Sequence, residues 1–360
     1  MKHSSLIIAL IGVAAAASTA AVSAQSAVTP YGLIDMAVVR ESGGSAGPAT
    51  KLTSGVSVGS RLGFKETEDL GNGLSAMFVL ENGFQGDTGT IGQGGVLFGR
   101  LAYIGLRGRF GLVLAGRQYT PEYLVVAFAD PFGSGYVADS KNIVATSGNA
   151  FSRMDNTVKY LSPTFAGFTV ELAAAPREVS GDSSAGRQVG GSIAYAAGPL
   201  QVRVGYHNRN NDTATVKNTE NGRNAVVAAV YDFKVIKAHV LYGANRGLNS
   251  SVLRNTANPF GQATAPVAST DSRDMLVGLT VPSGLHTLLV SYIRKDDRTT
   301  LDQDANQIAI GYRYTLSKRT SVYAVHARIE NRNGAGYTSG NASESGTGNR
   351  GTSVGISHAF

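Results

Sequence analysis

An alternation of apolar and polar residues runs through residues 60–81, where two segments meet at a tight glycine-rich turn. On the first segment Leu62 and Phe64 lie on one side, and Arg61 and Lys65 lie on the other. A period of two predicts strands with one apolar and one polar face. The same pattern recurs along most of the chain, so we expect an all-β protein.

The first residues are typical of a secretory signal peptide. A basic start is followed by an apolar run at residues 6–17, and the small residues Val22 and Ala24 mark a cleavage site. A transmembrane helix is the alternative, but the run is short and no stop-transfer flank follows. We therefore expect residues 1–24 to be removed and residues 25–360 to form one domain.

Composition limits the classes of protein to which the mature chain can belong. Glycine accounts for 45 of 360 residues, which suits many turns. No cysteine is present, so strand pairing and not disulfide bonds must close the fold. The formal charge of +7 comes from scattered Lys and Arg residues, so nucleic acid is not an expected partner.

Connections of two lengths alternate along the chain. Seven are short, at residues 69–73, 107–111, 162–167, 197–199, 232–234, 282–284 and 317–319. Eight are long, at residues 41–55, 82–95, 119–152, 176–187, 208–223, 245–273, 295–305 and 330–350. Fifteen connections imply sixteen strands, and short turns on one side with long loops on the other are typical of outer-membrane barrels.

The direction of the apolar face separates a barrel from a soluble sandwich. We expect it to face lipid, because the strands have the length that a tilted strand needs to cross a bilayer. The outward set then includes Ile308, Ile310, Tyr312, Tyr314 and Leu316, and, on the next strand, Tyr323, Val325, Ala327 and Ile329, with His326, Arg328 and Glu330 inward. Strands can lie in lipid only in a closed barrel. Residues 28–40 must therefore pair with residues 351–360, which end in Phe360.

Several segments resemble the general porins of Gram-negative outer membranes, which are trimeric sixteen-stranded diffusion channels. They are residues 31–35, 60–73, 80–84, 98–106, 116–119, 155–160, 162–163, 314–320 and 358–360. Glu66 departs from the pattern, since such porins usually carry Gly there. The resemblance implies a sixteen-stranded antiparallel transmembrane β-barrel with an inward-folded third loop. It also implies a homotrimer in the outer membrane, in contact with lipid and lipopolysaccharide.

The third long loop, residues 119–152, is the candidate for a pore constriction. Its run Tyr123–Phe128 is unusually apolar for an external loop, as expected for a segment packed against the barrel wall. In the porins that this chain resembles, the loop narrows the pore with acidic residues. The corresponding candidates here are Glu122, Asp130 and Asp139.

Four arginines are the expected basic wall. Arg61 lies on the polar face by alternation, the resemblance implies an inward position for Arg61 and Arg100, and Arg117 and Arg153 flank the third loop. Opposed arginine and carboxylate walls create a transverse field that sorts ions by sign. Because Arg stays charged and the chain is basic, we expect mild anion selectivity. Solvated surface arginines are the plainer alternative.

The function predicted is passive diffusion of small hydrophilic solutes and ions, without enzymatic activity, cofactor or metal. The histidines lack metal-ligand spacing, and no nucleophile elbow precedes a helix. A solute-selective channel is one alternative, for which we expect aromatic or basic ladders on the third loop. A surface-interaction role of the long loops is another.

Overall fold

A computed structural model describes residues 27–145, 152–176, 182, 184–251 and 253–360. The predicted signal peptide, residues 1–24, lies outside the described residues, so its cleavage stays a prediction. The described part contains seventeen strand segments in one sheet, one α-helix and two short 3-10 helices. Strands dominate because apolar and polar residues alternate along them, and glycines and asparagines fill the turns.

The strand segments follow one another along the chain, and the helix interrupts them once. They are β1 (Thr29–Ser42), β2 (Ala49–Ser54), β3 (Arg61–Gly71), β4 (Leu74–Gly83), β5 (Leu101–Gly108), β6 (Gly111–Tyr119), β7 (Arg153–Leu161), β8 (Phe168–Ala175), β9 (Gln188–Ala197), β10 (Leu200–Arg209), β11 (Gly222–Asp232), β12 (Lys237–Arg246), β13 (Asp271–Ser283), β14 (His286–Asp297), β15 (Ala305–Thr315), β16 (Thr320–Asn331) and β17 (Arg350–Ala359). The helix α1 spans Pro121–Ala129, and the 3-10 helices η1 and η2 span Gln93–Gly95 and Ser140–Asn142.

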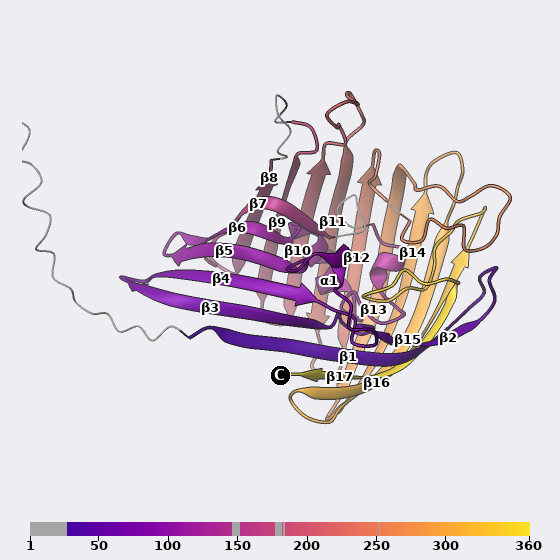
Figure 1. The fold of residues 1–360 in the computed structure, drawn as a ribbon, viewed down its shortest axis with the longest axis horizontal. Helices are drawn as coiled ribbons and strands as arrows, with labels where there is room; N and C mark the ends of the chain where they lie inside the picture. The colour runs from indigo at the N-terminus through magenta and orange to yellow at the C-terminus, as the bar shows by residue number, and fades with distance from the viewer. Residues whose placement is uncertain (1–26, 146–151, 177–181, 183, 252) are drawn as a thin grey trace, which may run out of the picture.

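The sheet closes on itself. From β3 onward each strand pairs antiparallel with the next, and β17 pairs with β1 in a register that sets Val38 opposite Val354. This pairing confirms the expected contact between the first and last strands. Figure 1 shows the strands standing around a common interior, with β1 and β17 side by side.

One barrel strand is split in two. Both β2 and β3 pair with β1, so the seventeen segments form sixteen barrel strands. Residues 55–60 leave the ladder between them, and the Asp35 carboxylate accepts from the amides of Val56 at 2.6 Å and Ser57 at 2.9 Å. The predicted first loop, residues 41–55, is therefore too long, because residues 49–54 form β2.

Short and long connections alternate as the sequence predicts, although the first long loop is shorter than expected. Short turns join strands at one end of the barrel, as at residues 72–73 and 284–285, where Asn72 and the glycines have positive φ. Eight longer loops join strands at the other end. Because short turns are periplasmic and long loops extracellular in such barrels, the arrangement defines the two ends.

The outer wall is apolar over most of the barrel. On β15 Ile310 and Tyr312 are 54% and 43% exposed, whereas their neighbour Ala309 is 2% exposed. Leu62 and Phe64 on β3 are exposed in the same way. The apolar side chains therefore point out of the ring and do not form the core of a sandwich.

The faces of β16 are the reverse of the sequence prediction. Its apolar residues Tyr323, Val325, Ala327 and Ile329 are buried inside the barrel, and His326, Arg328 and Glu330 are exposed on the outer wall. The reason is that the third loop covers the inner face of this strand and needs an apolar surface there. Alternation located the two faces of β16 correctly but could not tell which was outside.

Candidate functional site

The loop between β6 and β7 begins with α1. The Thr120 side chain accepts a hydrogen bond from the Tyr123 amide at 3.2 Å, and Pro121 occupies the first turn. A threonine cap followed by proline is a typical helix start. The sequence analysis predicted no helix, although this Thr-Pro pair was a signal for one.

The helix packs on the inner face of the barrel wall. Val125, Val126 and Ala129 are fully buried and join a cluster that includes Val226 of β11 and Leu241 of β12. The side chains next to Val226 on the strand point outward, so α1 lies on the opposite, inner side of the sheet. Burial of the two valines stabilises the position of the helix by about 1.5–3 kcal/mol each, and burial of the Ala129 methyl group adds less.

The rest of the loop crosses the lumen to the opposite strands. Asn142 Nδ2 donates to Gln307 Oε1 on β15 at 3.1 Å, and the ring of Tyr136 meets that of Tyr323 on β16 edge to face at 4.9 Å. A segment that touches β11 and β12 at one end and β15 and β16 at the other must lie inside the closed ring. The third loop is therefore folded inward.

Glycines on the inner wall make room for the loop. A Cβ added to Gly278 of β13 would lie 2.4 Å from Pro131 Cγ, and one added to Gly311 of β15 would lie 2.7 Å from Phe132 Cε1. Real Cβ atoms do not approach other heavy atoms so closely. Glycine at these two positions therefore allows the loop to pack against the wall in this position.

The Asp130 carboxylate is inside the loop. It accepts hydrogen bonds from the amides of Phe132 at 2.9 Å, Ser134 at 3.0 Å and Ser140 at 3.1 Å. Burial raises the pKa of Asp130 to about 6, against the lowering effect of these hydrogen bonds. The Asp130 carboxylate therefore stabilises the loop tip by accepting hydrogen bonds from three backbone amides.

The other two predicted acids are buried as well. Asp139 accepts from the Lys141 amide at 2.9 Å and contacts Arg254 Nη1 at 3.3 Å. Glu122 lies in the first turn of α1 and is 1% exposed. All three carboxylates are thus buried, whereas the sequence predicted that they face the pore. Asp130 and Asp139 bond to nearby backbone amides, and Asp139 also to cations, as short acidic chains in a tight loop do.

Arg61 and Arg100 share one carboxylate on the barrel wall. Arg100 Nε donates to Glu81 Oε1 at 2.7 Å, and Arg61 Nε lies 3.6 Å from Glu81 Oε2. The Tyr31 hydroxyl also donates to Glu81, at 2.9 Å. Glu81 and Arg100 are both almost completely buried and Arg61 is partly exposed, so the two guanidinium groups form one charged layer of the wall around a shared carboxylate.

Arg117 and Arg153 extend this layer toward the long loops. Arg117 donates to the Gly99 carbonyl at 2.8 Å and forms an ion pair with Asp155. Arg153 donates through Nε to the Arg100 carbonyl at 2.8 Å. The four arginines thus lie close together, and their role as the basic wall of a pore constriction stays a prediction.

One cavity of about 650 Å³ brings these residues together. It lies between the arginines and the third loop, which contributes Tyr123, Leu124, Ala127 and Lys141. Among the described residues that line it, six are cationic and none is Asp or Glu: Arg61, Arg100, Arg117, Lys141, Arg153 and Arg254. We call these six side chains the cationic lining.

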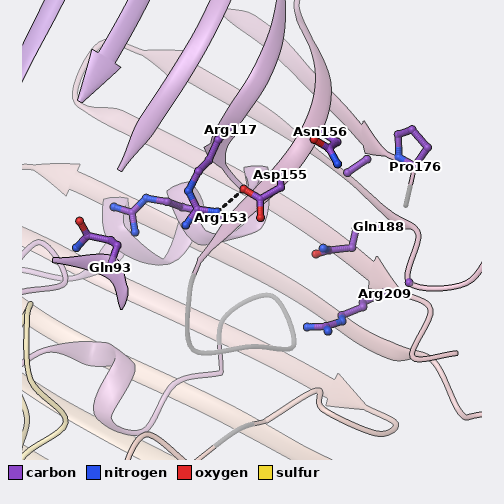
Figure 2. A pocket seen from close by; sticks show the side chains of 10 residues that line it. Gln93, Arg117, Arg153, Asp155, Asn156, Pro176, Gln188 and Arg209 are labelled. Carbon is purple, nitrogen blue, oxygen red and sulfur yellow. Dashed lines mark hydrogen bonds and ion pairs between the residues drawn. The ribbon is translucent and has the colours of Figure 1, made fainter. Parts of the chain in front are cut away.

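A second cavity of about 440 Å³ continues the first toward the long loops. Arg117, Arg153 and Gln93 line both, and Gln188 and Arg209 belong to the second alone. Figure 2 shows Arg117 and Asp155 paired at its edge, with Gln188 of β9 and Arg209 of β10 farther along the wall. Cationic side chains therefore continue from the first cavity into the second.

Sequence reasoning missed five residues of this site. Tyr119, Lys141 and Arg254 line the main cavity, Tyr123 stacks on Tyr119, and Glu81 pairs with the arginines. The inward position of Glu81 could be read from its alternation on β4. Arg254 could not be found this way, because it comes from the distant loop between β12 and β13.

In the described part of the chain, no three His, Asp or Glu side chains gather as metal ligands would. No described helix is long and apolar enough to cross a membrane.

The chain is similar to known porins over almost its whole length. Residues 9–334 match the family model for Gram-negative porins. The outer membrane porin protein 32 of Delftia acidovorans is 32% identical, with 98% of this chain and 99% of that protein covered. An outer membrane porin protein of Bordetella pertussis is 30% identical over 92% and 95%. The solved anion-selective porin from Comamonas acidovorans superposes with a TM-score of 0.75 at 27% identity, with 93% and 100% covered.

A closed sixteen-stranded ring with an outer apolar wall and an internal cationic cavity defines a membrane channel. The chain belongs to the Gram-negative porin family and is a β-barrel of the outer membrane.

Proposed function

We propose that the barrel is a water-filled pore through which small hydrophilic solutes diffuse passively, with mild preference for anions. The cationic lining is the observation that carries the preference. The acids Glu81 and Asp139 are not on the surface of this cavity, and Asp155 lines the second cavity, where it pairs with Arg117. An ion in the cavity thus meets guanidinium and ammonium groups first.

The physical basis is electrostatic. Two unit charges 4 Å apart interact by about 1 kcal/mol in bulk water and by about 4 kcal/mol at an effective dielectric of 20. A narrow cavity with low-dielectric walls lies between these limits. The pairing with acids reduces the net field, so the preference is mild. The similar solved porin, named as anion-selective, supports the same direction.

Reversal potentials across a planar bilayer test the proposal. In a KCl gradient the wild type should pass chloride more readily than potassium, and Arg61→Glu should reduce or invert this ratio. Arg246→Glu is the matched control, because Arg246 lies at the exposed outer end of β12 and should have a much smaller effect. A wild type that prefers potassium contradicts the proposal.

We also propose a homotrimer whose contact includes a polar strip on the outer wall. The strip comprises Arg40, His326, Arg328, Arg350 and Thr352, which are exposed and adjacent in register on β1, β16 and β17. Charged side chains facing hydrocarbon are costly, so protein is the better neighbour for them. Elsewhere the apolar wall is suited to the acyl chains of lipid and lipopolysaccharide.

The absence of native cysteine makes this assembly easy to test. Single cysteines at Thr352 and at the outward Val204 of β10 can carry a fluorophore that brominated lipid quenches. The label at position 352 should be protected from quenching, and the label at position 204 should be quenched. Sedimentation in detergent should give the mass of three chains. A single-chain mass, or equal quenching at both sites, would count against this trimer.

A further inference from the structure

The break between β2 and β3 places a short stretch of chain on the inner side of the barrel wall. Ile34 and Asp35 of β1 lie opposite residues 55–60, so this stretch has more residues than the ladder can pair. The surplus turns inward, because Val56 is fully buried on the side of Asp35, whereas Ile34 is exposed on the outer wall. We call residues 55–60 the inward segment.

The Asp35 side chain fixes the backbone of the inward segment. Its carboxylate accepts from the amides of Val56 at 2.6 Å and Ser57 at 2.9 Å, and from the Ser57 hydroxyl. At the other end of the segment, the Ser60 hydroxyl accepts from the Asp35 amide at 3.0 Å and donates to the Asp35 carbonyl at 3.2 Å. A fully buried carboxylate requires such donors, so Asp35 and the inward segment hold each other in one conformation.

The third loop packs directly on the inward segment. The Tyr136 amide donates to the Val56 carbonyl at 2.6 Å. On the other side, the Tyr323 hydroxyl of β16 donates to the Asp35 carboxylate at 3.0 Å, and the Tyr323 ring meets that of Tyr136 edge to face. Asp35 is therefore linked to the third loop by two routes, one through the inward segment and one through β16.

The inward segment also forms part of the surface of the 650 Å³ cavity. Val58 and Gly59 line this cavity together with Ser134 of the third loop. The last long loop contributes Ser343, whose hydroxyl donates to the Gly55 carbonyl at 3.1 Å. Two inward-folded parts of the chain, the third loop and the inward segment, therefore bound the cavity.

We propose that the inward segment is a second constriction element of the pore, and that Asp35 is the residue that positions it. The third loop limits the cavity on one side, and the inward segment limits it on another. The width available to uncharged solutes then depends on a carboxylate that no solute touches, because Asp35 is fully buried and does not line the cavity. This inference rests on the proposed diffusion pore and names what limits the size of the solutes that pass.

Liposome swelling tests the proposal, with arabinose as a small uncharged sugar and raffinose as a large one. Ser57→Ala removes a hydroxyl donor without changing any charge. The inward segment should then yield more easily, and the raffinose-to-arabinose ratio of rates should rise by about two- to tenfold, the shift expected for the loss of one hydrogen bond. Asp35→Asn places an NH₂ donor among the donors of the segment, and it should raise the ratio at least as much.

Asp297→Asn is the matched control for Asp35→Asn. The Asp297 carboxylate is also buried, and it accepts from the Ser269 hydroxyl at 2.6 Å and from the Gln303 amide at 2.8 Å. It lines neither cavity. The control should therefore disturb a buried carboxylate and its loop while leaving the raffinose-to-arabinose ratio as in the wild type.

A change of opposite sign keeps the test decisive if these variants do not fold. Val58→Phe enlarges a side chain that lines the cavity, so it should lower the raffinose-to-arabinose ratio below that of the wild type. The inference is overturned if folded Ser57→Ala and Asp35→Asn channels keep the wild-type ratio, or if a folded Val58→Phe channel does. Failure of the proposed function is a different result, since the wild type would then admit no arabinose.

Discussion

Asn142 and Gln307 join the tip of the third loop to the barrel wall by a buried pair of amides. Asn142 Nδ2 donates to Gln307 Oε1 at 3.1 Å, and Gln307 Nε2 donates to the Ala138 carbonyl at 2.9 Å. Both side chains are almost completely buried. The pair lies at the far end of the loop from α1, so it holds the segment in place after it has crossed the lumen.

Replacing Gln307 by Leu should loosen this end of the loop. The change leaves the Ala138 carbonyl without its donor, and an unsatisfied buried group costs about 1–3 kcal/mol. We expect more current noise and a shifted single-channel conductance, with the barrel intact. Asn306→Leu on the same strand is the control, because the Asn306 side chain faces outward, where its Oδ1 accepts from the Tyr292 hydroxyl at 3.0 Å. Equal noise in both variants would show that the amide pair does not anchor the loop.

The contact of the third loop with Gly311 should be as sensitive to substitution as the Asn142–Gln307 pair. Gly311→Ala places a Cβ 2.7 Å from Phe132, which must move, and such overpacking costs about 1–3 kcal/mol. We expect altered conductance from a displaced loop. Gly243→Ala is the matched change, since its Cβ would lie 3.5 Å from the nearest atom, which is ordinary contact. An unaltered channel in Gly311→Ala would mean that the loop accommodates the methyl group.

Asp130 should give the channel a pH dependence near 6. Its folded pKa of about 6 lies above the value of about 3.9 in an unfolded chain. Between these values the folded state holds a proton that the unfolded state has released, so this residue's contribution to stability falls as pH rises from 4 to 6. Below about pH 6 the loop also loses a negative charge close to Asp139, so anion preference should increase.

The measurement is the chloride-to-potassium ratio between pH 4.5 and 7.5. Asp130→Asn should abolish the step near pH 6 and leave the remaining profile unchanged. A wild-type profile without that step would contradict the raised pKa.

The sequence predicted the outward face of a strand best where the apolar side chains meet lipid and the other face is lined by small or charged residues. For β3 and β15 the alternation of Phe64 or Ile310 with small and charged residues gave the correct face. It failed for β16, because the apolar face of this strand is turned inward against the third loop, and the loop residues that pack on Val325 are distant in sequence. A local sequence pattern cannot report a partner that is distant in the chain, as Tyr136 is from Tyr323.

The candidate site divides in the same way. The four arginines could be predicted, since Arg61 follows from alternation and the others from position and resemblance. The roles of Asp130 and Asp139 could not, because their hydrogen bonds depend on how the loop folds within itself. Arg254 was also missed, since a long polar loop gives no sign of which side chain returns to the pore.

Arg254 connects three loops at the cavity and should control their motion together. Its guanidinium donates to Asn142 Oδ1 at 2.8 Å, to the Asn341 carbonyl at 2.7 Å and to the Glu344 carbonyl at 3.0 Å, and it contacts Asp139 at 3.3 Å. Arg254→Lys keeps the charge but cannot reproduce this fork. We therefore expect more frequent closures at moderate voltage in Arg254→Lys with nearly unchanged ion selectivity. In Arg254→Ala the same closures should come with weaker anion preference, because the cationic lining loses a charge. If both variants gate like the wild type, other contacts hold the three loops, and the role assigned to Arg254 in connecting them is wrong.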